Sequence, residues 1–375
     1  MSSSHSLRAI VAALILTFVF NPLAPAEEAP ADVRLDYDQI DFGNYVADHD
    51  HAGHDHVHGD GHFATHRADA HAPAGVMGEH MHAAGEWMVG YNYMVMHMDG
   101  NRNGTSRLSD AQVRGQGFPV VPTDMQMHMH MLGVMYAPLD EVNVMVMIPF
   151  VHKSMNHIAG MPLGAVRFKT ETSGIGDVAI SSLVKLFRSG GHRLHANLGL
   201  TAPTGRINHR DMTPMGNVIL PYPMQNGSGT VDLQPGATYM FQAEQWSAGA
   251  QVIGTIRLGR NYRGYTLGDK VNATAWFAWS FLRELSVSVR LNYEWWDDID
   301  GRDPSLMPAL VPTADTARRG GQRLDVLLGI NGAITDGPLK GLRVAIEGGV
   351  PVYQDLDGPQ LGTDFILYFT LQYAF

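Results

Sequence analysis

The chain ends in FILYFTLQYAF, residues 365–375, in which side-chain character alternates with a period of two. Counting from Phe365, every second residue is apolar or aromatic up to the terminal Phe375, whereas the residues between them are mixed. A period of two is that of a β-strand whose two faces meet different surroundings. A terminal aromatic residue that closes such a strand resembles the sorting signal of outer-membrane barrels.

Working back from this strand, the same alternation recurs throughout residues 86–375, and long and short connections alternate between the segments. This rhythm is typical of a transmembrane antiparallel up-and-down β-barrel, an all-β fold that pairs every backbone group and leaves no edge. The alternative is a secreted soluble β-sandwich, which would need far more charge than the 17% present. About twelve strands are expected, at 86–98, 125–137, 141–152, 174–187, 192–203, 231–243, 246–259, 267–281, 284–296, 321–333, 341–353 and 362–375.

The first 26 residues predict a secretory signal peptide. Arg8 precedes the apolar run Ala9–Phe20, and the small-residue triplet Ala24–Ala26 follows. The apolar run is too short to cross a bilayer as a helix. With an even number of strands, both ends of the mature chain would lie in the periplasm, and the barrel would lie in the outer membrane of a Gram-negative bacterium.

Composition excludes several functional classes. The net charge of −11 argues against a nucleic-acid partner, and the absence of cysteine excludes disulfides, thiolate metal sites and a cysteine nucleophile. No phosphate-binding loop, zinc-protease or serine-hydrolase motif occurs, so we expect no enzymatic activity. The expected partners are outer-membrane lipid, the barrel-assembly machinery, and either metal ions or small apolar solutes.

Two short motifs suggest a family. SGIGDV at 173–178 opens one predicted strand, and GLTAPTG at 199–205 closes the next. Together with the strand rhythm and Phe375, they resemble the outer-membrane family associated with the phenol meta-degradation pathway, over residues 86–375. The resemblance implies a barrel of this size and a transporter or channel, and it supplies no catalytic residues.

The segment 27–85 lacks an apolar period, so we expect it to be disordered and periplasmic. Ten of the 19 histidines lie at 49–82, with aspartates and small residues between them. Neutral imidazole binds Cu(II), Ni(II) or Zn(II), which makes this a compositional metal-binding signal; the alternative is an inert polar linker. The candidate metal ligands here are His49, His51, His54, His56, His58, His62, His80, Met81 and His82.

Methionine is also concentrated, with 15 of 21 residues between 77 and 161. Alternation places ten of them on the inward face of the first three strands, where barrels normally carry polar groups. Thioether sulfur prefers soft ions such as Cu(I) or Ag(I), although methionine also fills irregular apolar space. The candidate ligands in this wall are Met94, Met96, Met129, Met131, Met145 and Met147.

Two functions follow from these observations. In the first, the barrel is a transporter or channel linked to copper or silver through the histidine-rich segment and the methionine-lined lumen. In the second, it is a general channel for small apolar or aromatic compounds with no metal role. No cofactor is expected to be obligatory; copper, as Cu(I) or Cu(II), or another transition-metal ion, is the ligand expected in the first case.

Overall fold

The computed structural model describes residues 67–161 and 164–375, all within one compact unit. The predicted signal peptide and the candidate ligands between His49 and His62 lie outside the described residues. Among the described residues, no helix is long and apolar enough to cross a membrane.

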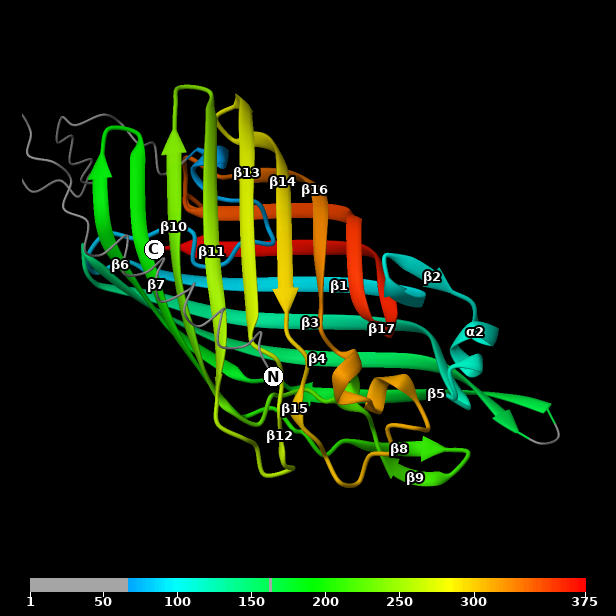
Figure 1. Cartoon of the computed structure of the whole chain (residues 1–375). Helices are drawn as coiled ribbons and strands as arrows, with labels where there is room; N and C mark the ends of the chain where they lie inside the picture. Colours follow the sequence, from blue (N-terminus) through cyan, green and yellow to red (C-terminus); the bar gives the residue numbers. More distant parts are fainter. Residues whose placement is uncertain (1–66, 162–163) are drawn as a thin grey trace, which may run out of the picture. The chain divides into compact units, whose positions relative to one another are not determined.

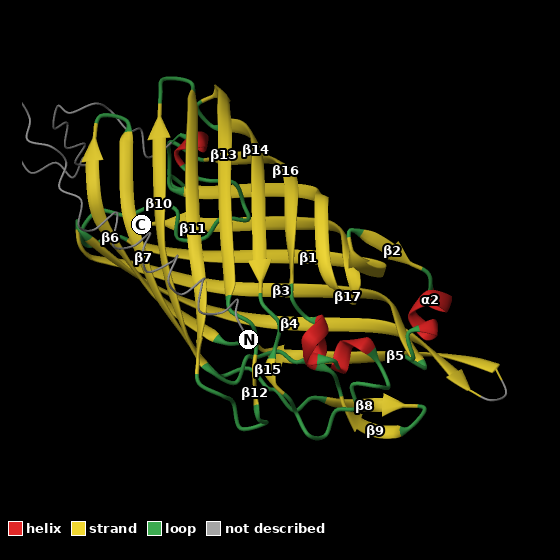
Figure 2. Ribbon diagram, viewed as in Figure 1, coloured by secondary structure: helices red, strands yellow, loops and turns green. Residues whose placement is uncertain are grey.

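In the described part of the chain, eleven antiparallel strands form one closed sheet in which each strand pairs with its neighbours and the last pairs with the first (Figures 1 and 2). β2 (Ser106–Leu108) and β5 (Gly164–Ile175) pair at its margin, outside the ring. The predicted all-β barrel is therefore confirmed. The ring consists of β1 (Trp87–Gly104), β3 (Val120–Leu139), β4 (Val142–Met161), β6 (Val178–Ser189), β7 (His192–Ala202), β10 (Val231–Gln242), β11 (Trp246–Leu258), β13 (Lys270–Leu282), β14 (Leu285–Trp296), β16 (Gly321–Ala333) and β17 (Leu342–Ala374).

The difference between eleven strands and the predicted twelve lies in β17. This strand is 33 residues long, and its first part pairs with β16 whereas its last part pairs with β1. The Ala374 N–H donates to the Gly341 carbonyl at 3.2 Å, so the two ends of β17 lie side by side and the strand folds back on itself. The two last predicted strands, 341–353 and 362–375, are thus the two arms of β17.

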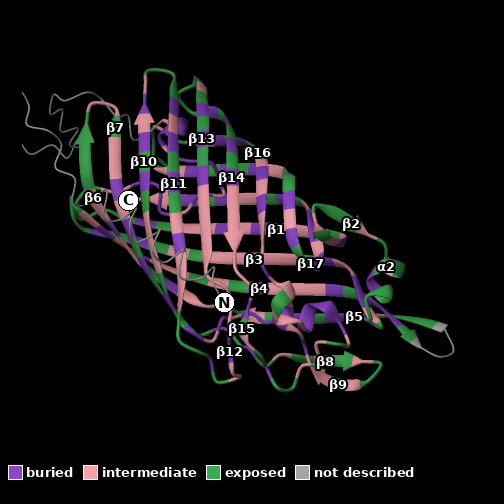
Figure 3. Cartoon of the chain, viewed as in Figure 1, coloured by how far each residue is buried: buried purple, intermediate pink, exposed green. Residues whose placement is uncertain are grey.

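The two faces of the sheet differ as the alternation predicts. Along β14, Val287, Val289 and Leu291 are exposed, whereas Ser288 and Arg290 between them are buried. Figure 3 shows the same alternation of buried and exposed residues along neighbouring strands. An apolar outward face and a polar inward face are what a barrel in lipid requires.

The long connections carry the small elements and all lie at one end of the barrel, opposite the tight turns (Figure 2). We refer to the long-loop end and the tight-turn end. The helix α2 (Asp110–Gly115) begins with a capping box formed by Ser109 and Gln112. The remaining elements are β8 (Arg210–Thr213), β9 (Gly216–Ile219), η2 (Tyr222–Met224), β12 (Tyr265–Thr266), β15 (Asp300–Gly301), η3 (Pro312–Ala314) and η4 (Thr316–Arg318).

Residues 67–82, which we call the lumen segment, lie against the inward face of the barrel. The Ala68 N–H donates to the Arg283 carbonyl in a tight turn, and the short helix η1 (Ala68–Ala70) follows, packed against β13, β14 and β16. Ala70, Ala72 and Val76 are buried with Met240 and Trp276. The expectation of disorder over 27–85 is therefore wrong for residues 67–82, because small side chains fit between inward-facing groups without any apolar period.

Candidate functional site

The first anchor of the lumen segment is a buried ion pair. Arg290 of β14 and Glu347 of β17 form two hydrogen bonds of 2.8 Å, and both side chains are almost completely buried. The Gly75 N–H donates to Glu347 Oε2 at 3.0 Å. A Cβ at Gly75 would lie 2.2 Å from Arg290 Nη2, so only glycine lets the backbone approach the ion pair this closely.

The second anchor holds the turn of the segment. The Gly78 carbonyl accepts hydrogen bonds from His195 Nε2 at 3.0 Å and from Asn197 Nδ2 at 2.9 Å, both on β7. Gly78 has a φ of +61°, a conformation that glycine adopts without steric cost. Gln251 of β11 donates to the neighbouring Met77 carbonyl at 2.9 Å. Strand side chains therefore satisfy the backbone of a segment that has no secondary structure of its own here.

The third anchor is Arg343 of β17, which is buried. Its Nη1 donates to Glu79 Oε1 at 3.3 Å and to Gln372 Oε1 at 3.0 Å, and its Nη2 donates to the Ala72 carbonyl. One guanidinium thus ties both arms of the lumen segment to the barrel wall. The three anchors together hold the segment in the half of the lumen nearer the tight-turn end.

Five titratable side chains from the lumen segment and the residues just after it lie in contact. Nδ1 of His71 is 3.4 Å from Nδ1 of His80, and Oε1 of Glu79 is 3.5 Å from the former and 2.9 Å from the latter. Nε2 of His80 is 3.1 Å from Nε2 of His82, and Nδ1 of His82 is 3.3 Å from Glu86 Oε2. Of the predicted ligands, His80 and His82 belong to this group.

Burial sets the protonation of the group. Desolvation, together with the charge of Arg343, lowers the pKa of His71 well below its usual value. Desolvation also lowers the pKa of His80, although the carboxylate of Glu79 opposes this. Burial alone would raise the pKa of Glu79, but His80, His71 and Arg343 outweigh it and hold the pKa well below its usual range. At neutral pH the cluster therefore contains neutral imidazoles and a carboxylate.

The methionine wall forms as the alternation predicted. Across β1 and β3, Met94 is opposite Met129 and Met96 is opposite Met127, and across β3 and β4 Met135 is opposite Met145. Two groups result. Near the tight-turn end, Met145 packs with buried Met88, Met135 and Leu183, with Met81 and Met147 against them. Met129 and Met131 are half-buried between that group and a cavity on the long-loop side, which Met96 lines.

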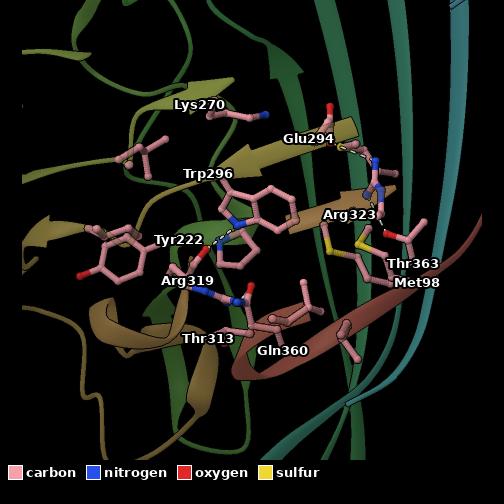
Figure 4. Close-up of a pocket in the computed structure, with 18 of the residues that line it drawn as sticks. Met98, Tyr222, Lys270, Glu294, Trp296, Thr313, Arg319, Arg323, Gln360 and Thr363 are labelled. Carbon is pink, nitrogen blue, oxygen red and sulfur yellow. Dashed lines mark hydrogen bonds and ion pairs between the residues drawn. The ribbon is translucent and has the colours of Figure 1, made fainter. Parts of the chain in front are cut away.

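That cavity has a volume of about 390 Å³ and lies in the lumen towards the long-loop end (Figure 4). None of the described residues that line it belongs to the lumen segment. Its wall is mostly apolar and includes Trp296, whose Nε1 donates to the Arg319 carbonyl at 2.7 Å. Five methionines from three strands line it, namely Met96, Met98, Met125, Met127 and Met155.

Charged and polar groups interrupt this wall. Arg323 pairs with Glu294 at 3.0 Å, and its Nη1 is 4.0 Å from the sulfur of Met96. Burial lowers the pKa of Arg319 to about 10, so this side chain is still cationic at neutral pH. Among the described residues that line the cavity, Thr313 Oγ1, Arg319 Nη1 and Arg257 Nε are buried without a hydrogen-bond partner. A bound molecule with one polar group could supply that partner.

Sequence reasoning missed several residues of this site. His71 stands among the counted histidines, but nothing in the sequence pairs it with Glu79 across eight residues. Trp296 and Thr313 lie at or beyond the end of a predicted strand, where alternation no longer assigns a face. Glu347 occupies an inward position of its strand, and this polar-in pattern is the signal that could have identified it.

The comparisons with known proteins fit this geometry. The family described as "Putative MetA-pathway of phenol degradation" matches residues 141–321. The family model thus covers the central part of the chain. The resemblance predicted from SGIGDV and GLTAPTG is confirmed, and both motifs lie in the matched region. No protein of curated function matches the chain.

One solved structure shows the same fold. An outer membrane channel from Pseudomonas putida F1 matches with a TM-score of 0.55 and 14% identity, over 80% of this chain and 99% of that chain. At this identity the match shows the fold alone. The transport unit of the autotransporter AIDA-I from Escherichia coli (TM-score 0.43, 10% identity, 80% and 93% covered) and the toluene transporter TbuX of Ralstonia pickettii (0.37, 10%, 79% and 90%) are too distant to carry an argument.

Proposed function

We propose that this protein is an outer-membrane channel for small apolar or aromatic compounds, and that the lumen segment closes its tight-turn half. The observation that carries the proposal is the methionine-lined cavity of about 390 Å³ in the lumen. An apolar cavity of about 150 Å³ is enough to bind benzene. Adaptable thioether side chains also suit a site that accepts solutes of several shapes.

The polar groups of the cavity refine the solute class. Thr313 Oγ1 and Arg319 Nη1 are buried and unpartnered among the described residues, so an aromatic solute with one hydroxyl group would satisfy more of the wall than a hydrocarbon. The family description, which names phenol degradation, supports the same class. The short turns would face the periplasm, the long loops would face outwards, and no catalytic step is assigned to the protein.

Passage of Cu(I) or Ag(I) along the methionine wall stays a second candidate. Three successive inward-facing pairs across β1 and β3 join methionine to methionine, and this run favours it. Replacing Met94, Met96, Met129, Met131, Met145 and Met147 by Leu separates the two functions: Cu(I) uptake into liposomes would be abolished, whereas passage of an apolar solute would continue.

The direct test is solute uptake by cells. A Gram-negative strain without aromatic channels of its own would express the protein, and initial uptake of radiolabelled p-cresol would be measured at micromolar concentration. We expect a several-fold increase over cells without the protein, and loss of most of that increase in Met127→Glu, which places a carboxylate in the cavity wall. Met215→Glu, exposed in the loop between β8 and β9, is the matched control. Uptake equal to that of cells without the protein would refute the proposal.

A further inference from the structure

Three ligand atoms from the two arms of the lumen segment converge on one point. They are Nδ1 of His71, Oε1 of Glu79 and Nδ1 of His80, at mutual distances of 3.4, 3.5 and 2.9 Å. Tetrahedral coordination with bonds of about 2.0–2.1 Å separates neighbouring ligand atoms by about 3.3–3.4 Å. The three atoms therefore have the spacing of three corners of a zinc-like coordination sphere. We propose that His71, Glu79 and His80 bind a divalent transition-metal ion, with Zn²⁺ the best geometric match.

The hydrogen bonds around the cluster support a cation at this point. Without a metal ion, neutral His80 must donate its Nδ1 proton to Glu79, so its Nε2 can only accept from His82 Nε2. Nδ1 of His82 lies 3.3 Å from Glu86 Oε2, so His82 links the ring of His80 to this carboxylate. Nδ1 of His71 lies 3.4 Å from Nδ1 of His80, and both nitrogens face the same oxygen of Glu79.

A metal ion at this point would use all three atoms as ligands. With the ion on Nδ1 of His80, its Nε2–H donates to His82, and Nδ1–H of His82 donates to Glu86. A chain of this kind, in which a metal-bound histidine donates its other N–H to an outer group, is the usual support of metal-ligating histidines. His82 would thus be a positioning residue, and the fourth coordination position would stay open to water or another ligand.

Arg343 limits which ions can bind. Its guanidinium donates to the same Glu79 oxygen at 3.3 Å, so a bound ion would lie close to a fixed positive charge. Mg²⁺ and Ca²⁺, which depend on oxygen ligands, have little to offset this repulsion, whereas imidazole binds Zn²⁺, Cu²⁺ and Ni²⁺ strongly. Met81 packs against the methionine group around Met88, so no thioether joins the three atoms.

A metal ion at this site would hold the lumen segment in place, whatever solute the channel carries. His71 precedes the turn at Gly78, whereas Glu79 and His80 follow it. One ion would therefore cross-link the two arms of the lumen segment. The free energy of metal binding would then stabilise the conformation in which the segment occupies the tight-turn half of the lumen. The inference does not depend on the solute, and metal binding is measured on purified protein without any transport step.

The experiment uses the full chain in detergent, with His49, His51, His54, His56, His58, His62 and His66 replaced by Asn so that the upstream tract cannot bind. Zn²⁺ titration with a competing chelator should give about one ion per chain. Co²⁺, as a spectroscopic probe, should give the intense visible absorption of a four-coordinate site. Mg²⁺ at the same concentration should not compete.

Each of His71→Gln, Glu79→Gln and His80→Gln should weaken Zn²⁺ binding at least about tenfold. His192→Gln, an exposed histidine that contacts Tyr239 on the outward face, is the matched control and should bind as the parent does. Heat-modifiable gel migration reports whether each barrel has folded. No Zn²⁺ binding by the folded parent, or stoichiometric binding that survives all three substitutions, would overturn the proposal, and neither result bears on aromatic uptake.

Discussion

The two halves of the lumen contrast sharply although the same strands build both. In the tight-turn half, the lumen segment fills the space and the wall charges are paired, as Arg290 with Glu347 and Arg343 with Glu79. In the long-loop half, a cavity of about 390 Å³ stays open and Thr313 and Arg319 keep unpartnered polar atoms. Inward polar residues therefore hold the lumen segment in one half of the barrel and line an open cavity in the other.

The largest effect is expected from breaking the contact between the segment and the wall. Gly75→Leu places a side chain where Arg290 Nη2 would be 2.2 Å away, so the segment should leave the wall and the tight-turn half should open. Single-channel conductance in planar bilayers should rise several-fold. Ala84→Leu, at an exposed position beside the segment, should leave conductance unchanged. Equal conductance in both variants would mean that the segment does not close the channel.

The next effect compares a buried ion pair with an exposed one. Glu347→Gln leaves Arg290 charged and buried, which should cost about 3–5 kcal/mol of stability. Asp300→Asn removes the partner of Arg260 at the long-loop end, where both side chains are largely exposed, and should cost at most about 1 kcal/mol. Urea unfolding monitored by tryptophan fluorescence checks both. Similar losses would show that the two pairs contribute alike.

Acidification should loosen the closed half without affecting the open half. Burial lowers the pKa values of His71 and His80, so the released segment takes up protons first as the pH falls below about 6.5. The docked segment is therefore favoured above that pH and disfavoured below it, and loss of the Glu79 charge acts in the same direction at lower pH. The facing charged or titratable groups are Arg343, His82 and His195.

Hydrogen exchange of residues 67–82 at pH 7.5 and pH 5.5, with chelator present, measures this loosening. Exchange should be faster at pH 5.5 after correction for intrinsic rates, whereas β14 should keep its protection. Replacing His71 and His80 together by Asn should remove most of the pH dependence. Protection that does not change between the two pH values would count against the assigned protonation states.

The smallest effect concerns the open half. Thr313→Val keeps the shape of the side chain but removes the unpartnered hydroxyl that lines the cavity. Binding of p-cresol should weaken by about 0.5–1.5 kcal/mol, and binding of toluene should stay the same or improve. Isothermal titration of the purified protein with both solutes separates the two cases. Parallel losses for both would indicate a change of shape rather than a lost hydrogen bond.

Whether a feature could be predicted from the sequence depends on how far apart along the chain its interacting residues lie. Alternation identified the strands, the outward face and the inward methionines, because the period of two is local and lipid enforces it on every strand. It missed β5 (Gly164–Ile175) and cut the longest strands short: β1 extends to Gly104, β3 begins at Val120 and β4 extends to Met161. The metal roles predicted for His80, Met81, His82 and the methionine wall stay predictions.

The amino-acid sequence alone therefore determined the barrel, the family of its central region, and a lumen wall rich in methionine. Tertiary structure alone decided that residues 67–82 enter that lumen, that His71 meets Glu79 and His80, and that Trp296 and Thr313 share a cavity with methionines from β1, β3 and β4. The physical reason is that strand patterning repeats every two residues, whereas each of these contacts joins groups distant along the chain, whose proximity exists only once the sheet has closed.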